Sequence, residues 1–158
     1  MYRIGQSKDI HKLENGRKLV IGTIEIPFEK GSVAHSDGDA LVHAICEAII
    51  GAMGLGDIGF HFPDSDIKYK DVSSSLFLKE VKKMLVQNEY EICNIDSTII
   101  IEEPILKNYK PLMREAIAKY LEISEDQINI KATRGEGLGY VGLKQGYEAQ
   151  AIVLIKKK

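Results

Sequence analysis

The sequence predicts an α+β fold: a single domain over residues 1–158 with one mainly four-stranded mixed sheet covered by helices, plus an N-terminal hairpin. The expected elements follow in the order β-β-α-α-β-α-β-β, which is an α+β pattern. No low-complexity tract, repeat or Pro/Ser-rich linker divides the 158 residues, so we expect one compact unit. Hydrophobic residues make up 44% of the chain and charged residues 28%, which is the balance of a globular protein.

The chain is expected to open with two strands. Residues Arg3–Gln6 and Leu19–Ile26 carry β-branched side chains near a period of two. Between them, Asn15-Gly16 is a typical turn dipeptide. These two strands account for the expected N-terminal hairpin.

Two amphipathic helices are predicted next. The first runs from about Asp39 to Met53, with Ser36 and Asp37 as capping residues, and two glycines stop it. The second follows the capping serines Ser73–Ser75 and ends near Asn88. Each helix would bury one apolar face against the sheet.

The second half of the chain supplies the rest of the sheet. Ile92–Ile101 is strongly β-forming, and Asn108–Leu121 is predicted to be a helix with Pro111 in its first turn. Two strands follow at Ile128–Thr133 and Glu148–Ile155, separated by a glycine-rich stretch.

Charge and composition argue against several classes of partner. The formal net charge of -2 provides no field that would attract nucleic acid. The most apolar stretch, Ala44–Leu55, is interrupted by Glu47 and is too short to cross a bilayer. Cys46 and Cys93 are isolated, as is typical of buried thiols in a reducing compartment. We therefore expect a cytoplasmic protein with no nucleic-acid or membrane partner.

Three residues are candidate ligands of a divalent cation. Asp9 and His11 are two positions apart, so on an extended strand end both side chains leave from the same face. His43 on the first helix is the third candidate, and Asp39, one turn earlier, is expected to fix its tautomer through a hydrogen bond. Two histidines and one aspartate with an open fourth position suit catalytic zinc. Alternatively, Asp9 and His11 form an exposed strand end and His43 is a core histidine.

Polar segments around the first helix suggest a phosphate and a polyol. His35 and Ser36 lie at the expected helix N-terminus, which favours anions. The loop Gly56–Asp66 is rich in acceptors for hydroxyl groups, although, taken alone, such a segment is more often a tight turn after a helix. Near the C-terminus, Thr133 and the N–H groups of the glycine-rich loop are expected to meet phosphate oxygens, and Glu136 to bind a hard cation.

In this order and spacing, the segments closely resemble the 2-C-methyl-D-erythritol 2,4-cyclodiphosphate synthases of the non-mevalonate isoprenoid pathway. The resemblance covers nearly the whole chain. It rests on four stretches, which are Asp9-Ile10-His11; His35–Asp39 with His43; Gly56–Gly59 with Phe62–Asp64; and Lys131–Thr133 with Glu136 and Leu138-Gly139.

The resemblance implies a role for each matching position. Zinc would be held by Asp9, His11 and His43, and magnesium or manganese by Glu136. Four residues would contact the reacting phosphates, namely His35, Ser36, Thr133 and Glu136. Two groups of residues would bind the substrate. The methylerythritol would contact Asp57, Gly59, Phe62 and Asp64. The cytidine diphosphate side would contact Ile101, Leu106, Ala132, Thr133 and Arg134. Members are homotrimers with active sites between subunits, so a homotrimer is expected.

The chain departs from the family pattern at several positions. Ser7 and Lys8 replace a glycine and an aromatic residue before the zinc aspartate. Arg134 replaces a threonine beside the phosphates, and a guanidinium pairs well with phosphate. Ile105 stands where the family usually has a lysine near the nucleotide, and Lys107 is close enough in sequence to take over that role. The segment Leu143–Gln145 replaces Arg-Gly-Glu near the trimer axis, which argues against an axial diphosphate ligand.

The implied reaction is intramolecular. The 2-phosphate of 4-diphosphocytidyl-2-C-methyl-D-erythritol 2-phosphate attacks the β-phosphorus, which gives the cyclic diphosphate and expels CMP. No protein nucleophile is needed, in agreement with the lack of a Ser-His-Asp or Cys-His signature. Two alternatives stay open: a zinc-dependent nucleoside diphosphate hydrolase and a trimeric binding protein that has lost catalysis. A purely structural zinc module is disfavoured, because closed structural sites favour cysteine.

Overall fold

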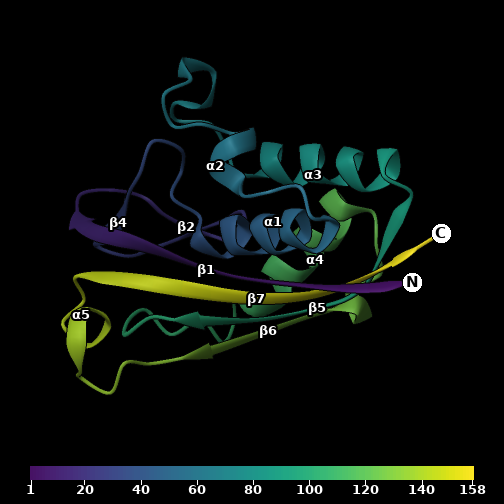
Figure 1. The fold of residues 1–158 in the computed structure, drawn as a ribbon. Helices are drawn as coiled ribbons and strands as arrows, with labels where there is room; N and C mark the ends of the chain where they lie inside the picture. Colours follow the sequence, from purple (N-terminus) through teal and green to yellow (C-terminus); the bar gives the residue numbers. More distant parts are fainter.

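The computed structural model describes residues 1–158 and confirms the α+β class (Figure 1). The strands are β1 (Tyr2–Asn15), β2 (Leu19–Ile21), β3 (Ile24–Ile26), β4 (Lys30–Val33), β5 (Tyr90–Ile100), β6 (Ile128–Thr133) and β7 (Gly146–Lys157). The α-helices are α1 (Ala40–Met53), α2 (Ile58–His61), α3 (Ser75–Gln87), α4 (Lys110–Leu121) and α5 (Gly139–Gly142), and two 3-10 turns are η1 (Ile67–Tyr69) and η2 (Glu125–Gln127). One core of 37 buried residues lies between the sheet and the helices.

The main sheet has five strands in the order β4-β1-β7-β5-β6, one more than the sequence predicted. The sheet is mixed, because β5 and β6 are parallel while the other neighbours are antiparallel. The fifth strand is β4, which pairs with the far end of β1 from Lys12 to Asn15. The prediction Arg3–Gln6 was too short because β1 carries polar residues, including Ser7, Asp9 and His11, at alternating inward positions. Those residues hide the hydrophobic alternation that marks a strand.

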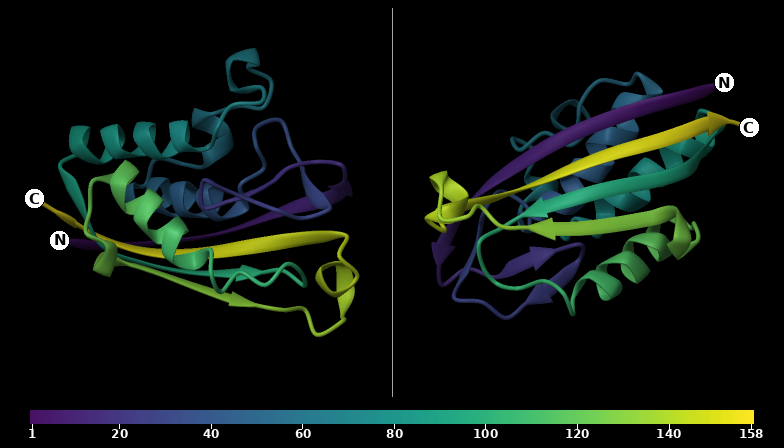
Figure 2. Two further views of the ribbon diagram at one scale, coloured as in Figure 1. Left: turned by 180° about the vertical axis from the view of Figure 1, so that it is seen from behind. Right: turned by 90° about the horizontal axis from the view of Figure 1, so that it is seen from below.

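Helices α1, α3 and α4 cover one face of the sheet, and the opposite face carries no helix (Figures 1 and 2). Helix α1 lies so close to β1 that a side chain at Gly5 would collide with the Ala48 carbonyl and with Ala52. This close approach places the side chains of α1 over the inward-facing residues of β1. No helix has the length and apolar character needed to cross a membrane.

The single predicted strand Leu19–Ile26 is in fact a tight hairpin of β2 and β3, separate from the main sheet. Gly22 and Thr23 form its turn with φ values of +60° and +68°, as the two central residues of a type I′ turn require. The buried carboxylate of Asp39 accepts both turn N–H groups, at 2.9 Å from Gly22 and 2.7 Å from Thr23. It also caps α1 by accepting from the Val42 N–H at 3.1 Å.

The Asp39 carboxylate makes the stability of the fold depend on pH. Burial and the charge of Asp37 raise the pKa of Asp39 from 3.8 to about 6, against its three backbone N–H bonds. The folded protein therefore binds this proton more tightly than the unfolded chain does. Compared with Asp39→Asn, we expect the wild type to lose up to about 3 kcal/mol of unfolding free energy as the pH rises from about 4 to about 7. Urea denaturation in chelator buffer at several pH values measures this difference, and a gain for the wild type would contradict it.

Candidate functional site

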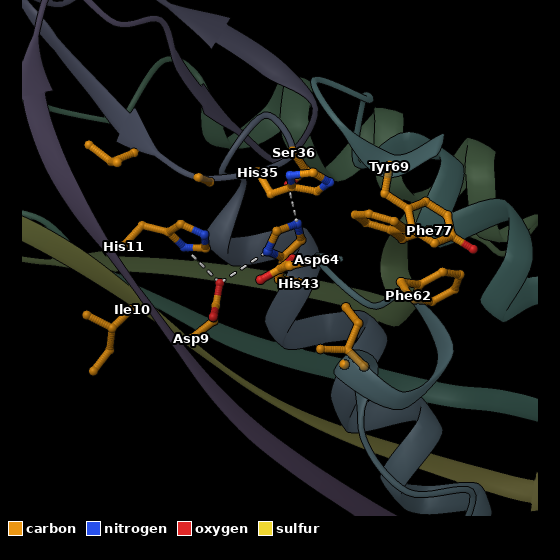
Figure 3. Close-up of a pocket in the computed structure, with 14 residues that line it drawn as sticks. Asp9, Ile10, His11, His35, Ser36, His43, Phe62, Asp64, Tyr69 and Phe77 are labelled. Atoms are coloured by element: carbon orange, nitrogen blue, oxygen red, sulfur yellow. Dashed lines mark hydrogen bonds and ion pairs between the residues drawn. The ribbon is translucent and has the colours of Figure 1, made fainter. Parts of the chain in front are cut away.

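The three predicted metal ligands come together on the inner side of the sheet (Figure 3). Asp9 and His11 alternate with outward-facing residues along β1, and His43 reaches them from α1. The Asp9 Oδ2 atom lies 2.9 Å from His11 Nδ1 and 3.3 Å from His43 Nδ1. One ligand atom from each residue fits within a mutual distance of 4.8 Å. Asp9 and His11 lie in the middle of β1, rather than at the strand end that the sequence suggested.

The chemistry of this cluster fits a divalent cation. The Asp9 Oδ2 and His11 Nδ1 atoms are buried and make no hydrogen bond. Burial would raise the pKa of Asp9, but contacts with His11 and His43 outweigh it and lower the pKa from 3.8 to about 2. Burial opposes the charged form of His43, yet Asp9 raises the His43 pKa above its ordinary value. A carboxylate kept charged between two imidazoles, with no protein donor in the fourth position, matches an open zinc site.

The predicted hydrogen bond between the Asp39 carboxylate and the His43 ring is absent, because that carboxylate accepts from backbone N–H groups of the hairpin and of α1. Instead, the His43 Nε2 atom lies 2.9 Å from Ser74 Oγ and 3.3 Å from Ser36 Oγ. Ser74 stands at the N-cap of α3, where the sequence suggested only a capping role, but its hydroxyl makes no capping bond. Sequence reasoning therefore missed Ser74 as a partner of the site.

The cluster of Asp9, His11 and His43 opens into a cavity of about 420 Å³. Of the predicted residues, the cavity is lined by Asp9, His11, His35, Ser36, His43, Gly59, Phe62 and Asp64. The His35 Nε2–H donates to the Asp66 carbonyl at 3.2 Å, which fixes this ring at the cavity rim. Asp57 does not line the cavity; its carboxylate instead caps α2 by accepting from the Phe60 N–H at 2.9 Å. One wall of the cavity is aromatic and consists of Phe62, Tyr69 and Phe77 (Figure 3). Of these three, only Phe62 was predicted from the sequence.

A second cavity of about 220 Å³ gathers the predicted nucleotide residues, and it shares no residue with the first. Its predicted members are Ile101, Leu106, Ala132, Thr133 and Arg134. Glu102, which sequence reasoning missed, is 8% exposed and organises this cavity. It accepts from the Arg134 guanidinium at 3.2 Å and from the Gly135 N–H at 2.8 Å. The Gly135 N–H is therefore not free for phosphate, and the prediction of phosphate binding by this loop is left to its other N–H groups and to Thr133.

The remaining predicted positions lie outside both cavities or at the rim. Glu136 has an exposed side chain and a φ of +55°, in the loop between β6 and α5. Ile105 lines the second cavity but is 80% exposed. Lys8 pairs with Glu148 at 2.9 Å, and Ser7 is buried against the Glu47 carboxylate, so both departures before Asp9 have partners.

Comparison with known proteins gives a consistent result over the whole chain. Residues 2–156 match the model of the YgbB family. The 2-C-methyl-D-erythritol 2,4-cyclodiphosphate synthase of Clostridium novyi is 54% identical over 156 residues, covering 99% of each chain. The bifunctional IspDF of Campylobacter jejuni superposes with a TM-score of 0.96 at 37% identity, covering 100% of this chain and 43% of that one. The CDP complex of Plasmodium falciparum IspF has a TM-score of 0.87 at 33% identity and covers 99% of this chain and 97% of that one.

Proposed function

The chain belongs to the YgbB family, and on that premise we propose that it is a 2-C-methyl-D-erythritol 2,4-cyclodiphosphate synthase. It converts 4-diphosphocytidyl-2-C-methyl-D-erythritol 2-phosphate into the cyclic diphosphate and CMP. The observation that carries this proposal is the first cavity, where the Asp9–His11–His43 cluster faces the same space as His35, Ser36 and the loop that carries Gly59 and Asp64.

The first cavity holds the reacting part of the substrate. His35 and Ser36 bind a phosphate, and the loop that carries Gly59 and Asp64 holds the methylerythritol. Asp57 supports this loop by capping α2. Held at both ends, the substrate folds back so that its own 2-phosphate oxygen faces the β-phosphorus, and positioning of this kind supplies much of the rate of phosphoryl transfer. The aromatic wall around Phe62 limits access of bulk water to the reacting atoms.

The second cavity takes the cytidine, with Ile101, Leu106 and Ala132 around it and Thr133 beside the diphosphate. The CDP complex of the Plasmodium falciparum relative supports a ligand of this class. The two cavities share no residue in one chain. We infer from the resemblance to homotrimeric family members that the complete site forms between subunits of a homotrimer. Arg134 contributes positive charge near the diphosphate. The Glu102 carboxylate fixes the orientation of the Arg134 guanidinium by accepting a hydrogen bond from it at 3.2 Å.

Two cations complete the site in this proposal. Asp9, His11 and His43 hold zinc, and Glu136 supplies a carboxylate for magnesium or manganese. When bound, such cations neutralise phosphate charge and polarise the phosphorus–oxygen bonds. The enzyme acts in the cytoplasm, which agrees with the two free cysteines, Cys46 and Cys93.

Turnover in water enriched with heavy oxygen tests the proposal against a zinc hydrolase. We expect no solvent oxygen in CMP or in the second product, because the attacking oxygen belongs to the substrate. A hydrolase leaves one solvent oxygen on a phosphate, since its nucleophile is activated water. Mass spectrometry of both products distinguishes the two reactions. A labelled, open-chain product made by the enzyme would rule out the synthase, and failure to turn over at all would favour a binding protein.

A further inference from the structure

Ser74 contacts the His43 ring and does not line the first cavity. It is fully buried at the N-terminus of α3, and its hydroxyl is placed between His43 and Asp37. The Ser74 Oγ atom lies 2.9 Å from His43 Nε2 and in close contact with Asp37 Oδ1. The Ser74 backbone N–H also donates to Asp37 Oδ2, at 2.8 Å, so the Asp37 carboxylate contacts both the hydroxyl and the backbone N–H of Ser74.

These contacts have only one consistent direction of donation. A serine hydroxyl carries one proton, and an ionised carboxylate can only accept. The Ser74 hydroxyl therefore donates to Asp37, and its oxygen is left to accept from His43. The His43 ring must then carry a proton on Nε2. In the neutral ring that metal ligation requires, Nδ1 keeps a free lone pair. Nδ1 is the nitrogen that faces Asp9, at 3.3 Å.

We propose that Asp37 and Ser74 are positioning residues, which orient the His43 ring and keep its Nδ1 bare as a metal ligand. A hydrogen bond to the second nitrogen of a ligating histidine is the usual means of fixing its tautomer, and here a serine relays it from a carboxylate. The inference rests on the metal site of the proposed function, but it does not depend on the identity of the substrate.

The relay also keeps Ser36 available. Both Ser36 and Ser74 approach the His43 Nε2 atom, at 3.3 Å and 2.9 Å. The single Nε2 proton is taken by the nearer oxygen, which is Ser74. Ser36 lines the cavity and Ser74 does not, so the hydroxyl that faces the substrate stays free to donate to a phosphate.

Ser74→Ala tests the relay. We expect its zinc affinity, measured by competition with a chelator, to fall by about 10- to 100-fold, as for other residues that support a metal ligand. Excess zinc should restore most of kcat, which distinguishes a positioning role from a catalytic one. Ser73→Ala is the matched control, because the exposed Ser73 hydroxyl contacts Ser75 rather than His43. Equal zinc affinity in the two variants would overturn the proposal.

Nitrogen NMR of the zinc-loaded wild type tests the same relay without any variant. Long-range proton–nitrogen correlations should place the His43 proton on Nε2, in slow exchange with solvent because Ser74 is buried. A proton on Nδ1 would overturn the proposal even if Ser74→Ala failed to fold. Neither measurement uses turnover, so failure of the relay and failure of the synthase activity are read from different experiments.

Discussion

His43→Ala is expected to remove zinc from the protein and to lower CMP release by about 1000-fold or more, because an electrostatic stabiliser of the reacting phosphate is lost with its ion. The His43 Nδ1 atom is one of three that converge on the site, and two remaining ligands bind weakly. Elemental analysis of purified protein measures the zinc, and a continuous assay for CMP measures the activity.

A matched control separates the loss of a ligand from the loss of any histidine. His61 is also partly buried, but its Nε2 atom donates to the Leu55 carbonyl at 2.8 Å and the ring does not line the cavity. His61→Ala should therefore keep its zinc. Circular dichroism must show that both variants are folded. Full zinc content in a folded His43→Ala protein would disprove the ligand assignment.

The three long helices, α1, α3 and α4, were predicted within one or two residues because their signals are local, whereas the four-residue helices α2 and α5 were not predicted. Caps and a 3.6-residue apolar period are visible in a short window, as in α1 and α3. The strand β1 was predicted far too short, since its inward positions are used for Asp9 and His11 rather than for core residues. The polar residues of the functional site thus interrupt the hydrophobic alternation by which the strand that carries them would be recognised.

The sequence predicted site residues where a local pattern places their side chains, as on one face of a strand. Asp9 and His11 share a strand face by simple alternation, and the structure confirms that they meet His43. The partners Ser74 and Glu102 could not be predicted, because each acts across a tertiary contact with a residue 31 or 32 positions away. Their local signals, a helix cap and a glutamate after a strand, indicate nothing about the site.

Mixing two inactive variants is expected to restore activity if each site is shared between subunits. Glu136→Gln should lower CMP release by about 100-fold by removing a charge near the leaving group. Its metal cluster stays intact, whereas His43→Ala keeps an intact Glu136. In randomly mixed trimers, about one quarter of the interfaces should combine an intact cluster with an intact Glu136 from the neighbour. Co-refolding the two variants in equal amounts should thus recover up to about a quarter of wild-type turnover.

The control mixture pairs His43→Ala with Asp9→Asn, two variants damaged in the same cluster. No interface in that mixture contains an intact metal site, so it should stay inactive. Light scattering of each mixture establishes the oligomer, which must be a trimer for the one-quarter yield to apply. If the first mixture were no more active than the control although mixed trimers had formed, Glu136 would act within its own chain or not at all. The inference that Glu136 and the Asp9–His11–His43 cluster of a neighbouring subunit share one site would then be wrong.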